Sequence, residues 1–217
     1  MERKVLLSIE SISKAFGGTK ALDNISLSVY GGEIHCIAGA NGSGKSTLIK
    51  ILTGAYKPDA GKIKIGGQEY ACLSPVQAAE EGIHAVYQEN ILAENLKVFE
   101  NVFAGHEFTN RFGFISAKLA KENVNKIAEK YDIAINPDKY VCDLSVAEKQ
   151  YVKILRAVAF NPKVLILDEP TAMLNISDSH RVLELMKRIA ERGTGVIFIS
   201  HHLSEVRDVA DVVTVFS

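Results

Sequence analysis

The sequence predicts an α/β protein with an antiparallel β subdomain, a mainly parallel core sheet and an inserted helical subdomain. Two observations predict one antiparallel and one parallel sheet. Residues 5–12 and 25–30 alternate apolar and polar side chains, which is typical of half-buried antiparallel strands. KVLILDEP at 163–170 and TGVIFISHH at 194–202 contain short, fully apolar runs joined by a helical pattern over 179–193. That order of strand, helix and strand is the unit from which parallel sheets are built.

A glycine-rich turn stands between a strand and a helix in the first half of the chain. EIHCIAGA at 33–40 is a dense apolar run that predicts a buried strand, and STLIKILTG at 46–54 repeats at helical spacing. Further along, GKIKIGGQ at 61–68 alternates again, and GIHAVYQ at 82–88 predicts another buried strand.

From about residue 90 the pattern becomes helical. Ala120, Val124, Ile127 and Tyr131 fall at positions i, i+4, i+7 and i+11, so they form one stripe of a helix, and packing is the simplest use of such a stripe. We therefore expect one domain over 1–217, with a core and β subdomain at 1–89 and 158–217 and a helical subdomain at 90–157.

Composition excludes several classes of function. The chain has 25 basic and 26 acidic residues, a net charge of -1 and no basic run, which argues against nucleic-acid binding. No signal peptide and no apolar run of membrane-spanning length is present, so any membrane role is predicted to be peripheral. Cys36, Cys72 and Cys142 lie far apart without metal-binding spacing, as reduced thiols of a cytosolic protein do. The last residues, VVTVFS, read as a strand without a closing loop, and we expect them to continue into a longer chain.

The segment GANGSGKST is the most specific signal in the sequence. It satisfies the pattern G-x-x-x-x-G-K-[ST] between a predicted strand and a predicted helix. Glycines allow successive backbone N–H groups to surround phosphate oxygens, and the helix adds the positive end of its dipole. Lys45 is predicted to reach the β and γ phosphates and Ser46 to bind Mg²⁺; the alternative is a plain glycine-rich turn. The predicted phosphate-binding residues are Gly39, Ala40, Asn41, Gly42, Ser43, Gly44, Lys45, Ser46 and Thr47.

Two acidic residues end the apolar strand of VLILDEP. The carboxyl ends of parallel strands are where α/β sheets bind ligands. Asp168 is predicted to hold Mg²⁺, directly or through water, and Glu169 to polarise an attacking water, although a lone acid here is also compatible with a helix cap or a loop. GTPases and small-molecule kinases do not generally place a second acid at this point, and no guanine-reading [NT]-K-x-D segment is present.

Two more polar residues end strands at the same predicted edge. Gln88 follows IHAVY and is predicted to reach the metal or the water. His201 follows FIS and is predicted to hydrogen-bond a γ phosphate. Alone, each would be an ordinary surface residue, and His202, without such support, is expected to be one.

Together these motifs resemble the nucleotide-binding domain of an ABC transporter over almost the whole chain. GANGSGKST resembles its phosphate loop, YQEN its Q-loop, VLILDEP its second nucleotide motif, TAML the start of its D-loop and ISHH its switch histidine. SKAFGGTKAL resembles the segment whose aromatic residue stacks on adenine, which implies contacts from Phe16 and Ala21; the alternative for Phe16 is the core. The segments at 12–63 and 195–215 resemble the first ATPase half of monosaccharide importers, which carry two such halves in one chain about twice as long. Nucleoside importers look similar.

The segment DLSVAEKQYVKIL occupies the position of the family's signature motif. Leu144 and Ser145 match L-S-G-G-Q, whereas Val146, Ala147 and Glu148 replace Gly, Gly and Gln. Ser145 and Glu148 also form the sequence pattern of a helix capping box. A serine hydroxyl used as a cap is less free for a γ phosphate, so we expect this half to complete its partner's site poorly.

An asymmetric pair follows from that expectation. Hydrolysis would occur mainly at the site built on Lys45, Asp168, Glu169 and His201, while the other site mainly binds ATP. Asn175, where the D-loop usually has Asp, keeps hydrogen bonding but loses the charge.

The resemblance implies ATP hydrolysis coupled to import, with ATP and Mg²⁺ as cofactors. It implies a second nucleotide-binding domain in a head-to-tail pair with Ser145 near the partner's nucleotide, integral membrane permease subunits, and indirectly a solute-binding protein, but no nucleic acid. The expected place is the cytoplasm, peripheral on the inner face of the cell membrane, with low activity for an isolated half. Apolar residues after Gln88 either dock the membrane partner or pack the helical core: Ile91, Leu92, Leu96, Val98, Phe99, Val102 and Phe103.

Two rival functions remain. A soluble ABC ATPase acting on ribosomes or DNA predicts a basic arm or a long charged insertion, and the sequence has neither. A module that binds nucleotide without hydrolysing it is disfavoured by the presence of Glu169 and His201.

Overall fold

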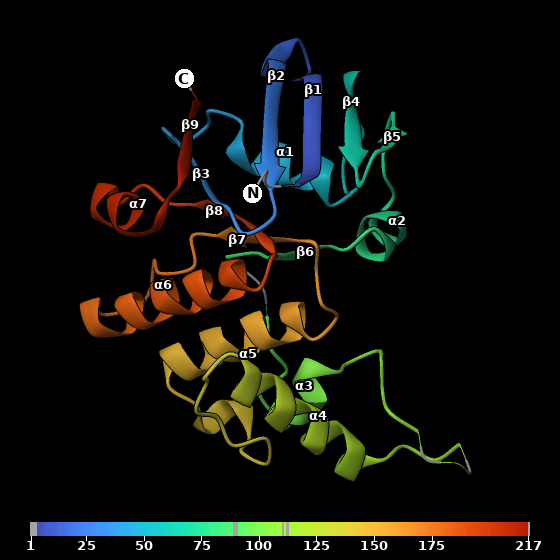
Figure 1. Ribbon diagram of the computed structural model, residues 1–217, viewed down its shortest axis with the longest axis vertical. Coiled ribbons are helices and arrows are strands. Elements are labelled where there is room, and N and C mark those ends of the chain that lie inside the picture. Colours follow the sequence, from blue (N-terminus) through green and yellow to red (C-terminus); the bar gives the residue numbers. More distant parts are fainter. Residues whose placement is uncertain (1–3, 89–90, 110, 112, 217) are drawn as a thin grey trace. The chain divides into compact units, whose positions relative to one another are not determined.

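The computed structural model describes residues 4–88, 91–109, 111 and 113–216 (Figure 1). The chain divides into two compact units, and each is described by itself. The sheet unit comprises Met1–Gln88, Pro162–Pro170 and Met186–Ser217, and the helical unit comprises Glu89–Asn161 and Thr171–Leu185. This division gives the helical unit residues 158–161 and 171–185 in addition to the expected 90–157. The expected boundary between Glu89 and Asn90 lies outside the described residues.

The sheet unit contains an antiparallel sheet of four described strands. Its order is β2-β1-β4-β5. The long strands β1 (Val5–Phe16) and β2 (Thr19–Tyr30) form a hairpin, and β4 (Ala60–Ile65) pairs with β1 on one side and with β5 (Gln68–Tyr70) on the other. The alternation in the sequence predicted β1, β2 and β4, which have both buried and exposed side chains, but not the short β5, which has no buried residue.

The second sheet of this unit has five described strands, and all its pairings are parallel. Its order is β6-β7-β8-β3-β9. The strands are β3 (Ile34–Gly39), β6 (Ile83–Val86), β7 (Val164–Asp168), β8 (Gly195–Ile199) and β9 (Val212–Phe216). The central strands β7 and β8 are apolar on both faces because both faces are buried.

One hydrophobic core joins the two sheets. It combines side chains of β1 and β4 with side chains of β3, β7 and β8 and with helix α1 (Lys45–Leu52). Leu48, Ile51 and Leu52 of α1 are inaccessible to solvent. The start of α1 is thereby fixed beside the end of β3.

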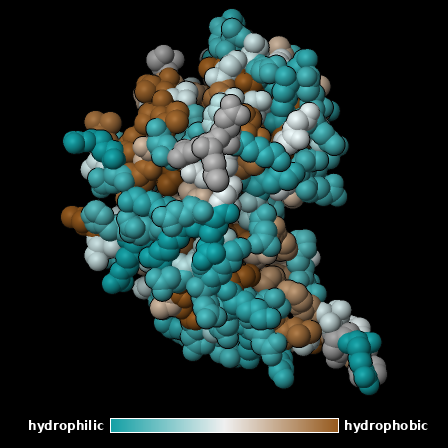
Figure 2. Space-filling model, viewed as in Figure 1, coloured by the Kyte–Doolittle hydropathy of each residue, from teal (hydrophilic) through white to brown (hydrophobic). Residues whose placement is uncertain are grey.

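Three more helices have residues in the sheet unit. They are α2 (Pro75–Glu80), α7 (Leu203–Val209) and the C-terminal part of α6 (Ile176–Glu191), whose residues up to Leu185 belong to the helical unit. Strand β9 forms one edge of the parallel sheet, with Val213 and Val215 45% and 70% exposed. Figure 2 shows hydrophobic side chains gathered over this edge strand.

The helical unit is built on α3 (Val98–Val102), α4 (Ala117–Lys130), the short 3-10 helix η1 (Val141–Asp143) and α5 (Val146–Val158). Helix α3 packs against both α4 and α5. The predicted stripe of α4 is a packing face, because Ala120, Val124 and Tyr131 are buried. The described residues between α3 and α4 form no helix, so the expectation of a mainly helical segment fails there.

Most of the apolar residues after Gln88 belong to the core of the helical unit. Leu92, Val98, Phe99, Val102 and Phe103 are at most 9% exposed. Ile91 is 86% exposed, and Leu96 lies between these extremes. Packing therefore explains five of these seven residues.

None of the helices in the described part of the chain combines the length and apolar character needed to cross a membrane.

Candidate functional site

A cavity of about 460 Å³ opens in the sheet unit where the strands of the parallel sheet end. Four segments contribute to its wall: the turn after β3, residue Gln88 beyond β6, the end of β7 and the end of β8. The lining residues are Ala21, Asn41, Gly42, Gly44, Lys45, Ser46, Thr47, Gln88, Asp168, Glu169 and Ile199. All of them except Ile199 are residues that the sequence predicts for a site. Ile199 is the last residue of β8, and its position two residues before the predicted His201 is the signal in the sequence that points to it.

The loop between β3 and α1 has a backbone that only glycine adopts easily. Gly39 and Gly44 have φ angles of 152° and 100°. A Cβ atom would lie 2.4 Å from the carbonyl oxygen of Phe216 at Gly39, and 2.2 Å from that of Ala21 at Gly44. Side chains are excluded at both positions by backbone atoms. The loop therefore packs tightly against β9 and β2, and its residues Asn41, Gly42 and Gly44 line the cavity.

The polar groups of this loop fit an anionic ligand. Gly44 is the N-cap of α1 and supplies no side-chain cap, so the first N–H groups of the helix are left for another acceptor. The buried hydroxyl of Ser43 has no hydrogen-bond partner within the described structure. The ammonium of Lys45 is held in the loop, where it donates to the carbonyl oxygens of Gly39 at 2.9 Å and Ala40 at 2.8 Å. A phosphate in the cavity would supply an acceptor for the N–H groups of the helix start and for the ammonium of Lys45.

Asp168 and Glu169 bring two carboxylates to the same cavity. Burial raises the pKa of Asp168, the negative charge of Glu169 raises it further, and the charges of Lys45 and Lys50 oppose the rise. A divalent cation beside Asp168 would oppose the raised pKa, because its positive charge stabilises the ionised carboxylate. No group of three or more His, Cys, Asp or Glu side chains in the described structure could hold a metal by itself. A site with Ser46, Gln88 and Asp168 suits Mg²⁺, which binds through one or two carboxylates together with substrate phosphates.

Glu169 has an unusual backbone conformation. Its φ angle is 47°, in the left-handed region, and its N–H donates to the carbonyl oxygen of Ile199 at 3.1 Å. Its Oε1 atom lies 3.2 Å from Nδ1 of His201. The left-handed turn after β7 thus places the Glu169 carboxylate beside His201.

Phe16 and His201 are not among the residues that line the cavity, although His201 reaches it through Glu169. Phe16 ends β1 and is 44% exposed, so the alternative that placed it in the core is wrong. Its ring meets that of Tyr56 edge to face, with centroids 5.4 Å apart. The ammonium of Lys14 lies 5.4 Å from its centroid. His202 is exposed, as expected.

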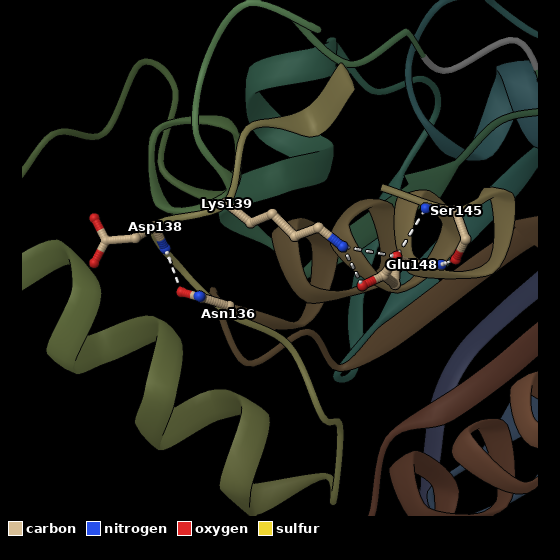
Figure 3. A network of polar contacts seen from close by, with 5 residues as sticks. All are labelled: Asn136, Asp138, Lys139, Ser145 and Glu148. Atoms are coloured by element: carbon tan, nitrogen blue, oxygen red, sulfur yellow. Dashed lines mark hydrogen bonds and ion pairs between the residues drawn. The ribbon is translucent and has the colours of Figure 1, made fainter. Parts of the chain in front are cut away.

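Ser145 lies in the helical unit at the start of α5, and the predicted capping box is present. The hydroxyl of Ser145 accepts the N–H of Glu148 at 3.2 Å, and the Glu148 carboxylate accepts the N–H of Ser145 at 2.7 Å (Figure 3). Glu148 therefore turns back to the backbone of its own helix. Lys139 also donates to this carboxylate at 3.1 Å, a contact that the sequence analysis missed.

Asn175 is likewise used locally. Its Oδ1 atom accepts the N–H of Asp178 at 2.9 Å, and its Nδ2 atom donates to the Asp178 carboxylate at 2.8 Å. The side chain caps the start of α6, which accounts for an amide at this position without a partner chain.

Comparison with known proteins decides the family. The sequence model of the ABC transporter family matches residues 22–172. The chain belongs to the ABC transporter family. The ribose import ATP-binding protein RbsA of Hahella chejuensis is 41% identical over 210 residues, which are 97% of this chain and 42% of that protein. This ABC transporter chain thus spans less than half the length of the curated relative.

Solved structures confirm the fold class of this ABC transporter chain. A nucleotide-free ATP-binding cassette from an ABC transporter has a TM-score of 0.87 at 28% identity, over 98% of this chain and 88% of that one. A dimeric ATP-binding cassette in a post-hydrolysis state, bound to ADP and Pi, has a TM-score of 0.81 at 25% identity, over 98% of this chain and 94% of that one. The predicted α/β ATPase fold with an antiparallel sheet and a parallel sheet is correct.

Proposed function

We propose that this chain is the ATP-binding and ATP-hydrolysing component of an ABC importer that takes up a sugar. One observation carries the ATPase part of this proposal. The glycine-rich loop with Lys45 and the carboxylates of Asp168 and Glu169 line one cavity, although more than a hundred residues separate them along the chain. A phosphate-binding surface beside an acid pair is what phosphoryl transfer to water requires.

Each residue of the cavity has a role in this proposal. The N–H groups of residues 42–47 and the ammonium of Lys45 bind and orient the phosphate oxygens of ATP. Ser46, Gln88 and Asp168 would hold Mg²⁺, which when bound neutralises part of the phosphate charge. Phe16 offers an exposed ring for stacking on the base. Lys45 and the helix dipole also favour the developing negative charge, so most of the catalysis is positioning and electrostatics.

Glu169 is the proposed group that polarises the attacking water. Its carboxylate lines the cavity and accepts the proton of that water at one oxygen, while Oε1 is held by His201 at 3.2 Å. His201 orients Glu169 and adds a hydrogen bond toward the γ phosphate. These roles are proposed for His201 and not for His202, because the hydrogen bond to Glu169 comes from the ring of His201.

The cargo part of the proposal rests on the relatives. The ribose import ATP-binding protein of Hahella chejuensis shares 41% identity with this chain, and that of Escherichia coli O157:H7 shares 40%. We therefore favour a monosaccharide, with ribose as the first candidate. This domain would meet no sugar itself, because the permease subunits carry the cargo.

The assembly is proposed on the same basis. This chain would be the first of two tandem nucleotide-binding domains, consistent with its match to 42% of the relative's length. The two domains would pair head to tail beneath the permease, at the inner face of the cell membrane. Hydrolysis would be concentrated at the site of Lys45 and Glu169, because Ser145 is already engaged as a helix cap at the other site.

The decisive experiment is ATP turnover by the full-length protein carrying Glu169→Gln. The amide keeps the size of the side chain but cannot accept the proton of water, so turnover falls about 100-fold or more while ATP binding persists. The matched control is Glu80→Gln, an exposed carboxylate of α2 outside the cavity, which leaves turnover unchanged. If the Glu169→Gln protein keeps most of its turnover, both the assigned role and the asymmetric pair are wrong.

Uptake tests the cargo separately. Cells that depend on this importer are expected to accumulate labelled ribose with the wild-type protein and not with Glu169→Gln. Accumulation of a labelled nucleoside instead would overturn the sugar assignment and leave the ATPase assignment intact.

A further inference from the structure

The carboxylate of Glu148 is held from two directions at the start of α5. From its own helix, it accepts the N–H of Ser145 at 2.7 Å. From outside the helix, it accepts hydrogen bonds from the ammonium of Lys139, whose Nζ lies 3.1 Å from Oε1 and 3.4 Å from Oε2 of Glu148 (Figure 3). The backbone N–H of Ser145 is the main cause of a lowered Glu148 pKa, and Lys139 lowers it further. The carboxylate is therefore charged at neutral pH, and Lys139 supplies the balancing charge.

The backbone around Lys139 is fixed by hydrogen bonds. Its carbonyl oxygen accepts the N–H of Val98 at 3.0 Å, at the start of α3, and its N–H donates to the carbonyl of Asn136 at 3.2 Å. The Asn136 side chain accepts the N–H of Asp138 at 2.9 Å, which closes the turn that leads to Lys139. Lys139 thus reaches Glu148 from a defined position, and an ordered donor loses less conformational entropy than a free one.

The charged residues next to Lys139 and Glu148 in the sequence are paired with other groups. Asp138, next to Lys139, contacts Lys97 at 3.3 Å and Lys121 at 2.5 Å. Lys149, next to Glu148, contacts Glu94 at 2.8 Å. Lys139 and Glu148 therefore form an ion pair that does not include Asp138 or Lys149.

The start of α5 faces solvent. Val146 is 56% exposed, and the side chains of Lys139 and Glu148 are 36% and 30% exposed. An anion that approaches Ser145 would meet the Glu148 charge. A lone carboxylate about 8 Å from one phosphate charge would weaken binding about 30-fold at an effective dielectric constant of 20.

We propose that Lys139 is a positioning residue that neutralises Glu148, keeps it folded back on Ser145, and so allows a polyphosphate to approach the start of α5. The polyphosphate is the ATP bound by the second nucleotide-binding domain, and this step rests on the proposed function. A glutamate at this position is then compatible with ATP only because a lysine nine residues earlier accompanies it.

The first test needs no nucleotide and therefore does not depend on the proposed function. The Glu148 carboxyl is titrated by NMR in the purified 217-residue chain and in its Lys139→Met, Lys139→Arg and Lys149→Met variants. The pKa of Glu148 rises in Lys139→Met and keeps its wild-type value in the other two. Lys149→Met is the matched control, since that lysine is adjacent to Glu148 in sequence but pairs with Glu94. An unchanged Glu148 pKa in Lys139→Met overturns the proposal.

The second test measures the Kd for ATP at the second nucleotide-binding domain in the full-length protein, in a Lys45→Ala background that leaves this site to bind ATP. Lys139→Met raises that Kd about tenfold, less than the unscreened 30-fold because the pair is partly exposed. Lys139→Arg keeps the Kd of the background protein, and the double variant Lys139→Met, Glu148→Gln recovers it because no unbalanced charge remains. A double variant as weak as Lys139→Met alone overturns the proposal. A wild-type protein without ATP turnover would refute the proposed function, and the titration would still decide the role of Lys139.

Discussion

Glu169 carries backbone strain at the residue where the chemistry is proposed. A non-glycine residue at a φ of 47° costs about 1 kcal/mol or more. The hydrogen bond from its N–H to Ile199 fixes the conformation, and the turn aims the carboxylate into the cavity and toward His201. The strain is therefore tied to the placement of the functional group.

This strain predicts a difference between two inactive variants. Glu169→Gly relieves the left-handed conformation, whereas Glu169→Ala removes the same carboxylate without relieving it. The glycine variant is expected to be more stable than the alanine variant by about 1 kcal/mol in urea unfolding, while both lose ATP turnover. Equal stability of the two variants would contradict this expectation, because the strain at a φ of 47° would then only offset the backbone entropy that glycine loses on folding.

Cys36 gives a prediction for alkaline pH. Its thiol lies in β3 with no exposed surface, and burial raises its pKa from 9.0 to about 11. The unfolded chain loses this proton at a lower pH than the folded chain. The stability that the protonated thiol adds to the free energy of unfolding is therefore fully present below pH 9 and is lost as the pH rises toward 11.

Replacing Cys36 with alanine separates the effect of this thiol from that of other groups that titrate at alkaline pH. The free energy of unfolding of the wild-type chain is expected to fall more steeply between pH 9 and 11 than that of Cys36→Ala. The matched control is Cys142→Ala, an exposed thiol, which keeps the wild-type slope. Parallel curves for wild type and Cys36→Ala would contradict the assignment.

At the scale of elements, periodicity predicts the long and buried ones. Strands β7 and β8 are apolar apart from Asp168 at the end of β7, and β3 is apolar apart from His35, because both faces of these strands are covered. Helix α4 shows its stripe because one face is buried. Helices α2, α3 and α7 have only five to seven residues each, which is too short for a helical repeat to show. Helix α2 nevertheless carried a local signal, a Ser74 cap followed by a proline and Gln77, which completes a capping box.

Local motifs and long-range contacts differ in how far the sequence predicts them. The phosphate loop and the capping box of α5 depend on residues within a few positions of each other, so their patterns are visible in the chain. The Lys139–Glu148 pair depends on the turn at Asn136 and on the bond to Val98, neither of which has a sequence pattern. The edge-to-face contact of Phe16 with Tyr56 was hidden for the same reason, since it joins the β1–β2 hairpin to the loop after α1.

The cap of α5 predicts a stability change at this scale. Ser145→Ala removes the acceptor for the N–H of Glu148 and is expected to cost about 1 kcal/mol, or about 2–4 °C in Tm for a chain of this size. Ser145→Thr keeps an acceptor oxygen and is expected to retain most of the wild-type Tm. Thermal unfolding followed by circular dichroism measures both, and equal losses in the two variants would show that the hydroxyl is not the stabilising group.

At the scale of the whole molecule, the nucleotide loop and the start of α5 belong to different compact units. In the proposed pairing, the helical unit of one domain completes the cavity in the sheet unit of the other. In that pairing, one copy of this chain would provide one nucleotide cavity and one helix start that serves a different nucleotide. Hydrolysis would then be a property of the pair.

Turnover should accordingly depend on whether a partner is present. The isolated 217-residue chain is expected to hydrolyse ATP slowly, with a specific activity that rises with protein concentration, because two copies must meet before a site is complete. The full-length protein is expected to be much more active and independent of concentration, since its second domain is tethered at a high effective concentration. Adding the Glu169→Gln chain in excess should change the ATP turnover per wild-type chain, because pairs of one wild-type and one variant chain form. An isolated chain whose specific activity equals that of the full-length protein at every concentration would mean that one domain hydrolyses ATP alone.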